Sequence, residues 1–313
     1  MRELPVQVPG EPPLAGTLTL PDAPAPVPAV LLAAGSGPLD RDSNHRRLRF
    51  DVTRALAHAL AEGGLASLRY DKRGVGGSPG DWRAAGLYDN VDDLARARDA
   101  LTARPEVDPG RILLAGHSEG AVLAAALAGR AGSAQVAPVA GVVLLAMTAT
   151  PGAELLRWQA RQIAPTLPAP VRGLLRLLRT DLEARVAANH RRILATTRDV
   201  ARIGGARINA RWTREFLRHD PREDLARLTV PVLALTGDKD VQVPADDLAV
   251  LAATVSGPVE VRRVPDLTHT LRRQPRPASL RNYREELRRP VDPELCATVV
   301  VWCRSVTGGP ASS

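Results

Sequence analysis

Short apolar runs rich in β-branched residues alternate along the chain with longer segments whose apolar residues recur every three or four positions. The first pattern predicts buried strands, and the second predicts amphipathic helices. Because the two alternate, we expect an α/β fold with a mostly parallel, doubly wound sheet and helices on both faces. The predicted strands span residues 14–20, 29–34, 65–70, 111–115, 141–146, 230–236 and 259–264.

Three helices are predicted between these strands. The first lies within residues 45–64, where Leu48, Val52 and Leu56 share one stripe and a Gly-Gly pair ends the pattern. The second covers "YDNVDDLARARDALTA", and the third begins at Glu119 and continues through "GAVLAAALAGR". Each of them follows a predicted strand, as a βαβ series requires.

The alternation stops between residues 151 and 224, where only helical patterns follow one another. Such a block predicts a helical cap, or lid, inserted into a core formed by residues 1–150 and 225–313. A packed helical excursion that contacts no ligand is the alternative interpretation. The predicted helices of the block span residues 153–164, 170–179, 181–203 and 207–220.

Composition places the chain among ordinary globular proteins. Its 313 residues suffice for one large domain, and 44% of them are hydrophobic. Arg, Pro or Gly interrupts every long apolar run, so we expect no stable membrane insertion. The first residues contain no uninterrupted apolar segment before a cleavage-like site, and a cytoplasmic location is therefore expected.

The net charge of +8 raises the question of nucleic-acid binding. Arginines supply almost all of the positive charge, and they are spread along the chain among acidic residues. Lys72 and Lys239 are the only lysines, and aromatic residues make up only 3% of the chain. Without a basic patch or a stacking platform, no nucleic-acid partner is expected.

Two cysteines, Cys296 and Cys303, lie in one apolar segment near the end of the sequence. On a helix their Cα atoms would be about 10.5 Å apart, at about 1.5 Å of rise per residue. A disulfide requires Cα atoms within about 7 Å, so both thiols are expected to be reduced and buried.

The sequence "GHSEG" around Ser118 carries the clearest chemical signal. It matches Gly-x-Ser-x-Gly, and it lies after a predicted strand and before a predicted helix, which is the context of a nucleophile elbow. Gly116 and Gly120 leave room for the strand and the helix to pass close together at so sharp a turn. We therefore interpret Ser118 as a nucleophile rather than as an ordinary turn serine.

A serine nucleophile requires a base, and the base in turn requires a carboxylate that orients it. The strand "VPVLALTG" leads into Asp238 and Asp240, and the strand "VEVRRVP" leads into His269. These positions follow Ser118 in the order Ser, acid, His and lie at the carboxyl ends of strands. We predict Asp240 as the acid, with Asp238 as the rival that braces the turn, and His269 as the base.

Acyl transfer also requires hydrogen-bond donors for an oxyanion. The backbone N–H of Glu119, directly after the nucleophile, is one predicted donor. The second is the backbone N–H of Ser36, in the glycine-flanked stretch "AAGSGPLDRD", although a simple glycine turn is the alternative. The charged residues 40–42 in that stretch are expected to fix the loop rather than react.

The glycine-rich stretch Arg69–Gly80 resembles a phosphate-binding loop only superficially. It lacks the Gly-Lys-Ser/Thr ending and a helix directly after the glycines, so a structural loop is predicted, with Asp71 and Arg73 paired. No Cys/His cluster or His-Glu-x-x-His sequence occurs. Neither a metal nor a cofactor is therefore expected.

Taken together, "GSGPLDRD", "LRYDKRGVGGS", "GHSEG", "TGDKDVQVP" and "DLTHTL" resemble α/β-hydrolase-fold serine hydrolases, in the group of bacterial esterases and serine-aminopeptidase-like enzymes. The resemblance extends from about residue 14 to 306, and the helical block matches only as a generic cap. It implies an esterase-like triad of Ser118, Asp240 and His269. One departure is Ala34 before Gly35, where many relatives have histidine.

The resulting hypothesis is a cofactor-independent hydrolase of small to medium carboxylic esters. Leu155, Trp158, Trp212 and Phe216 of the helical block are candidates for the substrate pocket, although such residues are more often plain core. A peptidase or amidase with the same triad is the nearest alternative. A catalytically idle scaffold that binds a ligand or partner is the alternative from another class.

Overall fold

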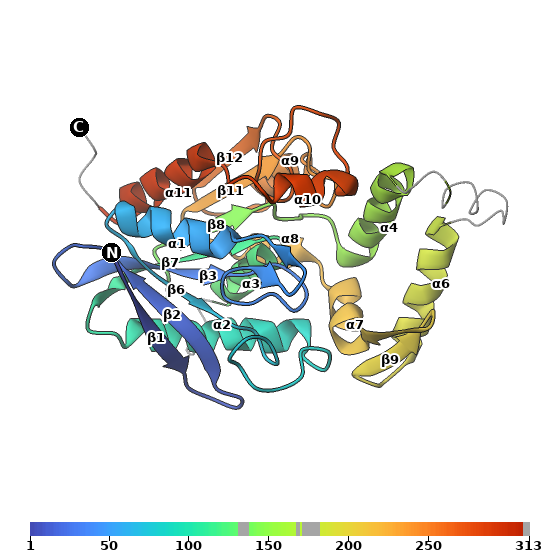
Figure 1. Ribbon diagram of the computed structural model, residues 1–313, viewed down its shortest axis with the longest axis horizontal. Helices are drawn as coiled ribbons and strands as arrows, with labels where there is room; N and C mark the ends of the chain where they lie inside the picture. Colours follow the sequence, from blue (N-terminus) through green and yellow to red (C-terminus); the bar gives the residue numbers. More distant parts are fainter. Residues whose placement is uncertain (131–137, 167–169, 171–181, 309–313) are drawn as a thin grey trace.

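The computed structural model describes residues 1–130, 138–166, 170 and 182–308. Within these residues the main sheet has eight strands in the order β1-β2-β6-β3-β7-β8-β11-β12 (Figure 1). From β6 onward the neighbours in this order pair in parallel, whereas β1 and β2 are antiparallel to their neighbours. The strands are β1 (Arg2–Val8), β2 (Leu14–Leu20), β3 (Val27–Ala33), β6 (Ala66–Tyr70), β7 (Val107–His117), β8 (Gly141–Leu145), β11 (Val232–Gly237) and β12 (Val259–Val264).

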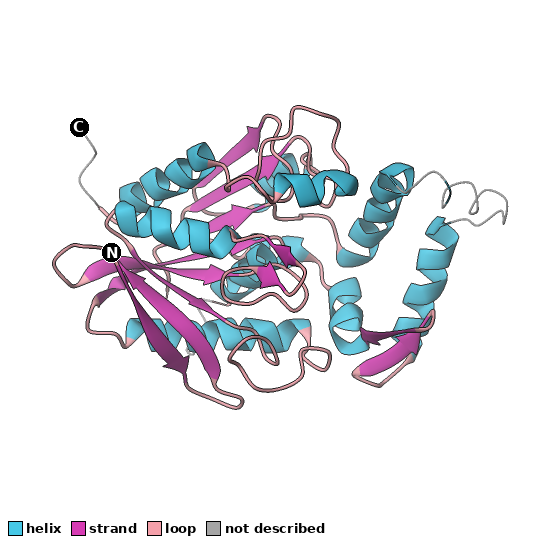
Figure 2. Cartoon of the chain, viewed as in Figure 1, coloured by secondary structure: helices cyan, strands magenta, loops and turns pink. Residues whose placement is uncertain are grey.

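Helices cover both faces of this sheet, as the alternating pattern predicts (Figure 2). One face packs its apolar side chains against α1 and α11, and the other against α2, α3, α8 and α9. The central helix α3 is buried almost all round, which its run of alanines permits. The bounds are α1 (Val52–Glu62), α2 (Leu87–Thr102), α3 (Glu119–Gly129), α8 (Pro221–Leu225), α9 (Asp247–Thr254) and α11 (Pro293–Val306).

Edge elements are where the structure departs from the sequence prediction. The strand β1 was not predicted, and its Pro5 is tolerated because an edge strand leaves one row of its N–H groups outside the ladder. The predicted first helix begins only at Val52, since residues 44–49 form the short ribbon β4 (Asn44–His45) and β5 (Leu48–Arg49). The short elements η2 (Leu280–Asn282) and α10 (Tyr283–Glu286) were not predicted either.

Between β8 and α8 the chain leaves the sheet and forms the group of elements at the right of Figure 1. The prediction that this block is entirely helical is wrong, because β9 and β10 pair as an antiparallel ribbon. Gly204 and Gly205 both have positive φ, which is the geometry of a two-residue hairpin turn. The predicted helix 170–179 lies almost entirely outside the described residues. The described elements are α4 (Gly152–Ile163), η1 (Ala164–Thr166), α6 (Leu182–Ala195), β9 (Val200–Ile203), β10 (Ala206–Asn209) and α7 (Ala210–Arg218).

Both cysteines lie on α11, where they are buried and free, as expected. Burial raises the pKa of Cys296 to about 11 and that of Cys303 to about 12. Both thiols therefore stay protonated and unreactive at neutral pH. Across the described residues, no helix is long and apolar enough to cross a bilayer.

Candidate active site

Ser118 occupies the sharp turn between β7 and α3, with φ 57° and ψ −121°. This conformation is strained for a residue with a side chain, and such strain concentrates at functional sites. The two flanking glycines permit it. A Cβ on Gly116 would lie 2.0 Å from the carbonyl oxygen of Gly120, and a Cβ on Gly120 would lie 2.1 Å from that of Ala33. The small residues at these positions are therefore a steric requirement of the turn.

The histidine predicted as the base lies between the serine and the acid. His269 Nε2 is 3.1 Å from Ser118 Oγ, and His269 Nδ1 is 2.8 Å from Asp240 Oδ2. Asp240 and His269 follow β11 and β12, so the carboxyl ends of three parallel strands bring the three residues together. The side chain of Asp240 is fully buried, which strengthens its interaction with the imidazole. The geometry is that of a Ser-His-Asp triad.

The two candidate acids have different surroundings. Asp240 Oδ1 accepts hydrogen bonds from the backbone N–H groups of Gln242 and Val243, at 2.7 and 2.9 Å, which leaves Oδ2 for the histidine. Asp238 Oδ1 instead accepts from the backbone N–H of Asp266 at 2.7 Å, in an exposed position. Asp238 therefore braces the two loops, and the structure brings Asp240 alone to His269.

His117, to which the sequence assigned no role, holds the loop of His269. Its Nε2 lies 2.9 Å from the carbonyl oxygen of His269, and the two ring centroids are 4.9 Å apart. Burial, with a smaller contribution from His269, lowers the pKa of His117 to about 3. The ring is therefore neutral at pH 7, and Nε2–H is the donor to that carbonyl. No local sequence signal marks this contact, because it joins residues 152 positions apart.

The other side of the His269 loop is anchored by a buried carboxylate. Thr268 and Thr270, which flank the histidine, both donate hydrogen bonds of 2.9 Å to Glu286 Oε2. Glu286 is fully buried and comes from the short helix α10. The loop is thus fixed on both sides of the histidine, and this orients the imidazole before any substrate binds.

The two predicted oxyanion donors lie beside Ser118. Ser36, Ser118 and Glu119 line one cavity together. A Cβ on Gly35 would lie 3.5 Å from Ser118 Cβ, so the loop after β3 runs directly against the elbow. Glu119 begins α3, where backbone N–H groups have no partner within the helix. Both N–H groups therefore belong to backbone that borders Ser118.

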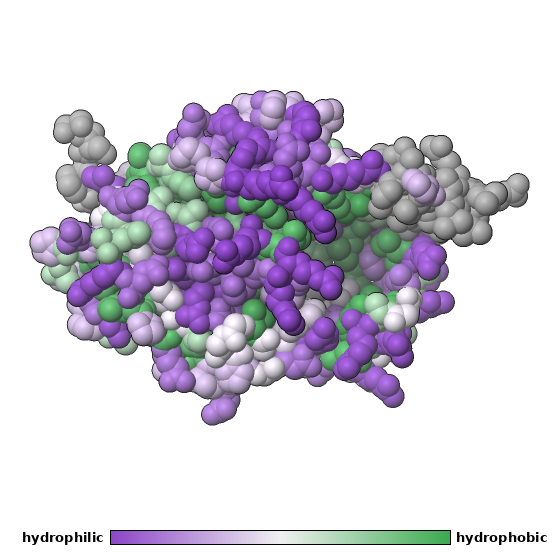
Figure 3. All heavy atoms as spheres, in the orientation of Figure 1, coloured by the Kyte–Doolittle hydropathy of each residue, from purple (hydrophilic) through white to green (hydrophobic). Residues whose placement is uncertain are grey.

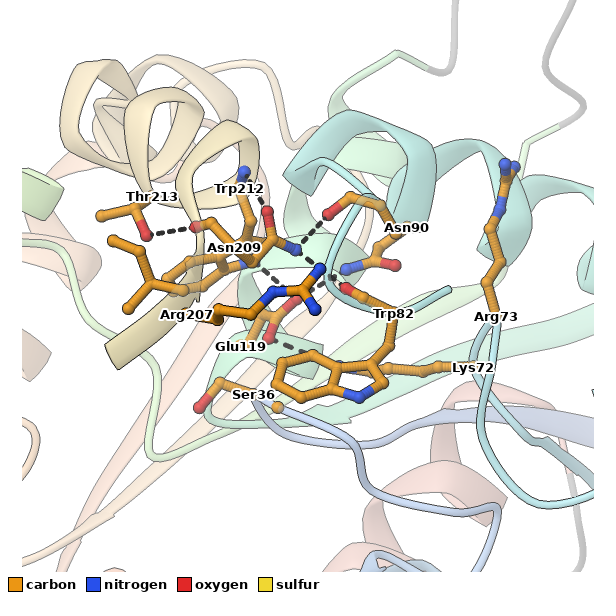
Figure 4. Close-up of a pocket in the computed structure, with 13 residues that line it drawn as sticks. Ser36, Lys72, Arg73, Trp82, Asn90, Glu119, Arg207, Asn209, Trp212 and Thr213 are labelled. Carbon is orange, nitrogen blue, oxygen red and sulfur yellow. Dashed lines mark hydrogen bonds and ion pairs between the residues drawn. The ribbon is translucent and has the colours of Figure 1, made fainter. Parts of the chain in front are cut away.

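A buried ion pair between Lys72 and Glu119 also reaches Gly35, the residue before Ser36, and sequence reasoning missed it. Lys72 Nζ donates a 2.6 Å hydrogen bond to the carbonyl oxygen of Gly35 and lies 3.3 Å from Glu119 Oε2. Glu119 Oε1 accepts from Asn90 Nδ2 at 3.0 Å and from Trp212 Nε1 at 3.1 Å (Figure 4). All the polar groups of this carboxylate thus have partners, as a buried charge requires.

The loop Arg69–Gly80 is structural, but its predicted internal ion pair is wrong. Asp71 pairs with Arg41, at 2.6 Å, and accepts further hydrogen bonds from the backbone N–H groups of Arg41 and Gly77. Arg73 reaches Asp93 on α2 instead, at 2.6 Å. Arginine side chains are long enough to leave their own loop, and the sequence alone does not indicate which carboxylate they reach.

The charged stretch 40–42 fixes the loop after β3, in agreement with the expectation. Arg41 ties it to Asp71, and Asp42 Oδ1 accepts a 2.7 Å hydrogen bond from the buried Arg69. Asp40 accepts from the backbone N–H of Asn44 at 2.8 Å, which closes the turn. These contacts tie the loop after β3 to β6 and to the residue that directly follows it.

The sequence of this chain is similar to those of known proteins, and this similarity identifies its family. A family model described as serine aminopeptidase, S33, matches residues 50–275, which is well over half of the chain. The chain belongs to this S33 family. Among curated proteins, esterase EstD of Thermotoga maritima is 27% identical over 261 residues, which are 82% of this chain and 58% of EstD. The chain thus spans less than two thirds of that relative's length.

Solved structures share the fold of this S33 family member. Est1E from Butyrivibrio proteoclasticus with bound ferulic acid has a TM-score of 0.63 at 17% identity, covering 96% of this chain and 99% of that chain. Proline iminopeptidase from Mycobacterium smegmatis has a TM-score of 0.63 at 17% identity, covering 97% and 99%. Similarity at this level shows the fold alone, and the fold is that of the α/β hydrolases, as the sequence resemblance implied.

Two cavities of this S33 family member adjoin at Ser36, Glu119 and Trp212, which line both of them. The smaller, of about 100 Å³, is lined by Ser118 together with a mixture of apolar and polar side chains. The larger, of about 340 Å³, extends from Ser36 to β10 and α7 (Figure 4). Trp212 lines both cavities and stacks on Phe216, with ring centroids 4.9 Å apart. Figure 3 shows apolar surface in the hollow between the sheet and the elements of residues 152–218.

The predicted pocket residues divide into two groups. Leu155, Trp212 and Phe216 line the smaller cavity. Trp158 does not line either of these two cavities; it is half-buried and packs against the core on the α2–α3 side of the sheet. Among the described residues of this S33 family member, no group of three or more His, Cys, Asp or Glu side chains could hold a metal ion.

Proposed function

We propose that this chain hydrolyses carboxylic esters of small to medium acyl groups through an acyl-enzyme intermediate. The observation that carries the proposal is the position of His269, within hydrogen-bond distance of both Ser118 and Asp240. A serine hydroxyl is too weakly acidic to attack by itself, and a base oriented in this way removes its proton as it attacks. Membership of the S33 family and the similarity to an esterase support the same reaction class.

In the acylation step, Ser118 Oγ forms a bond to the ester carbonyl carbon while its proton passes to His269 Nε2. Asp240 accepts a hydrogen bond from Nδ1–H and stabilises the imidazolium that forms. The tetrahedral intermediate then collapses, the bond to the leaving oxygen breaks, and Nε2 returns the proton to the departing alcohol. Water repeats the sequence on the acyl-enzyme and releases the carboxylic acid, so that each proton taken up by the histidine is given back.

The negative charge that develops on the carbonyl oxygen requires donors already in place. We assign this role to the backbone N–H groups of Ser36 and Glu119, which border the cavity of Ser118. The apolar part of the lining, to which Leu155 and Phe216 contribute, limits competing water near this oxygen, and electrostatic interactions are stronger where water is excluded.

Residues 151–224 act in this proposal as a cap over the active site, and the core consists of residues 1–150 and 225–313. Leu155 and Gln159 of α4, and Trp212 and Phe216 of α7, border the cavity that contains Ser118. The packed excursion without ligand contact, the alternative interpretation of this block, does not predict such a position. Cavities of about 100 and 340 Å³ suit small and medium acyl groups better than a long lipid chain.

The charges around the cavities favour an ester over the substrate of an aminopeptidase. A substrate with a free α-ammonium group needs an available carboxylate. Among the described residues that line the two cavities, Glu119 is the only acid, and Lys72, Asn90 and Trp212 already occupy it. Arg207, at the larger cavity, adds a positive charge with no acidic partner among the described residues. A cationic substrate end would therefore be repelled.

The test compares p-nitrophenyl esters of two to twelve carbons with p-nitroanilides of alanine and proline, on the wild type and on Ser118→Ala. We expect the largest kcat/KM for an ester with an acyl chain of eight carbons or fewer, and a loss of at least about 10³-fold in the variant. Undiminished activity in Ser118→Ala would contradict the nucleophile. A higher kcat/KM for the anilides would replace the esterase by an aminopeptidase, and no turnover of either series would favour the idle scaffold.

A further inference from the structure

Lys72 is a buried cation placed behind the reacting groups rather than among them. Its side chain is 8% exposed, and it follows β6 on the loop that the sequence had marked as merely structural. The ammonium group has three protons, and two acceptors are in reach: the carbonyl oxygen of Gly35 at 2.6 Å and Glu119 Oε2 at 3.3 Å. Removing an ammonium group from water costs free energy that a buried ion pair does not always recover. Stabilisation of the fold alone therefore does not explain why Lys72 is buried here.

The hydrogen bond to Gly35 has a consequence for Ser36. The carbonyl group of Gly35 and the N–H group of Ser36 belong to one planar peptide unit, and in a trans peptide they point in opposite directions. The Gly35–Ser36 bond is trans. Because the ammonium of Lys72 holds the carbonyl oxygen on one side, the N–H of Ser36 must face the other side. Gly37, with φ of +83°, is conformationally permissive. Without the hydrogen bond from Lys72, the backbone next to Gly37 could therefore rotate easily.

The ion pair links the same ammonium to the second donor. Glu119 contributes its backbone N–H beside Ser118, and its carboxylate contacts Lys72, so one side chain connects the backbone of both predicted oxyanion donors. Figure 4 shows Lys72, Glu119 and Ser36 converging at one end of the larger cavity. The positively charged ammonium that donates to this carbonyl oxygen also polarises the peptide unit, which makes its N–H a stronger donor.

We propose that Lys72 is a positioning residue that holds the Gly35–Ser36 peptide so that its N–H faces the oxyanion. The proposal rests on the proposed function, because it requires that Ser118 attack a carbonyl or an equivalent centre. Lys72 itself touches no reacting atom. Its alternative role is only to neutralise the buried carboxylate of Glu119, and the two roles give different results when both charges are removed together.

The experiment uses the variants Glu119→Gln and Lys72→Met/Glu119→Gln in the full chain. Both lack the ion pair, and they differ only in the group that holds the Gly35 carbonyl. The readout is the rate at which an alkyl fluorophosphonate labels Ser118, since this reaction also develops negative charge on an oxygen but does not depend on the choice of ester. Thermal unfolding of each variant shows that the fold is kept.

We expect the double variant to be labelled at least about tenfold more slowly than Glu119→Gln, since a lost oxyanion donor lowers rates by about 10²–10³-fold. In ester hydrolysis kcat should fall in parallel, with KM changed less than about threefold, and affinity for a trifluoromethyl ketone should fall with kcat. Equal labelling rates in the two variants, with both folded, would overturn the role of Lys72. A wild type that is not labelled at Ser118 would instead overturn the proposed function.

If the double variant does not fold, Lys72→Arg provides the second test. The guanidinium keeps the positive charge beside Glu119, but its planar donors do not reproduce the compact ammonium contact with the Gly35 carbonyl. The positioning role predicts slow labelling in a folded variant of unchanged net charge. Labelling at the wild-type rate would show that charge alone is required, and it would contradict the proposal.

Discussion

The Nε2–H group of His117 donates a hydrogen bond to the carbonyl oxygen of His269, with 2.9 Å between the nitrogen and the oxygen. One of these residues directly precedes the candidate nucleophile, and the other is the candidate base. The nucleophile strand and the loop of the base are therefore joined by a hydrogen bond that does not involve the triad itself. This contact depends on a neutral imidazole, which gives it a testable pH dependence.

Burial lowers the pKa of His117 from its ordinary value of 6.5 to about 3 in the folded chain. The unfolded chain takes up a proton below pH 6.5, whereas the folded chain resists it. The stability due to neutral His117 is thus fully present above about pH 6.5 and is lost as the pH falls toward 3, by about 1.4 kcal/mol per unit.

Urea unfolding between pH 7.5 and 4.5 measures this dependence. His117→Gln keeps an amide donor for the His269 carbonyl but does not titrate, so its free energy of unfolding should decline less steeply with falling pH than that of the wild type. Parallel curves for the two proteins across this range would show that His117 is not a buried neutral group.

The two aspartates after β11 offer a matched pair of substitutions. Asp240→Asn removes the acceptor that orients His269, and kcat should fall by about 10⁴-fold while the chain still folds. Asp238→Asn alters only the brace to Asp266, and kcat should change less than about threefold. Steady-state hydrolysis of one p-nitrophenyl ester by both variants is the measurement. The reverse order of the two losses would make Asp238 the acid.

At the turn around Ser118, adding a side chain to Gly120 should destabilise the fold for steric reasons alone. A Cβ there would lie 2.1 Å from the backbone carbonyl oxygen of Ala33, which cannot move away as a flexible side chain could. Gly120→Ala should therefore lower the free energy of unfolding by about 3 kcal/mol or prevent folding. Gly110→Ala is the control, because its Cβ would meet only a carboxylate oxygen at 3.4 Å. Equal stabilities in urea unfolding would contradict the close approach.

Trp212 separates the two cavities and should therefore control the length of the acyl group. Trp212→Ala opens the cavity of about 100 Å³ toward that of about 340 Å³, so the preferred p-nitrophenyl ester should become longer. Trp158→Ala removes the same side chain from the same segment but away from both cavities, and the preferred length should stay the same. A shift caused by Trp158→Ala, or none caused by Trp212→Ala, would contradict this division of the site.

The difference between these two tryptophans shows where sequence reasoning stops. Both lie on predicted helices of one block, and both helices form. A helical pattern identifies an apolar face, but it does not state which neighbour that face meets. Both rings pack against the core, but Trp212 also donates a hydrogen bond to Glu119 and lines the two cavities, whereas Trp158 lines neither. The sequence does not reveal the ribbon β9–β10 because its residues read as the end of one helical pattern and the start of the next. Only Gly204 and Gly205 interrupt these patterns between residues 200 and 209.

The order of Ser118, Asp240 and His269 could be predicted, because each follows a strand whose apolar pattern is local. The carboxyl ends of parallel strands share an edge, and so a local pattern leads to a prediction about distant residues. The supporting contacts of Lys72, His117 and Arg41 could not be predicted in this way. Their partners lie 30 or more positions away, and side-chain reach decides among several possible acceptors.

The central claim is that an acyl group is transferred to Ser118, and mass spectrometry of the acid-quenched enzyme during turnover of p-nitrophenyl butyrate tests it most directly. The account predicts a burst of about one p-nitrophenol per enzyme, with one butyryl group on the peptide that contains Ser118 and none in Ser118→Ala. A butyryl group on another residue, or turnover in Ser118→Ala at the wild-type rate, would contradict it.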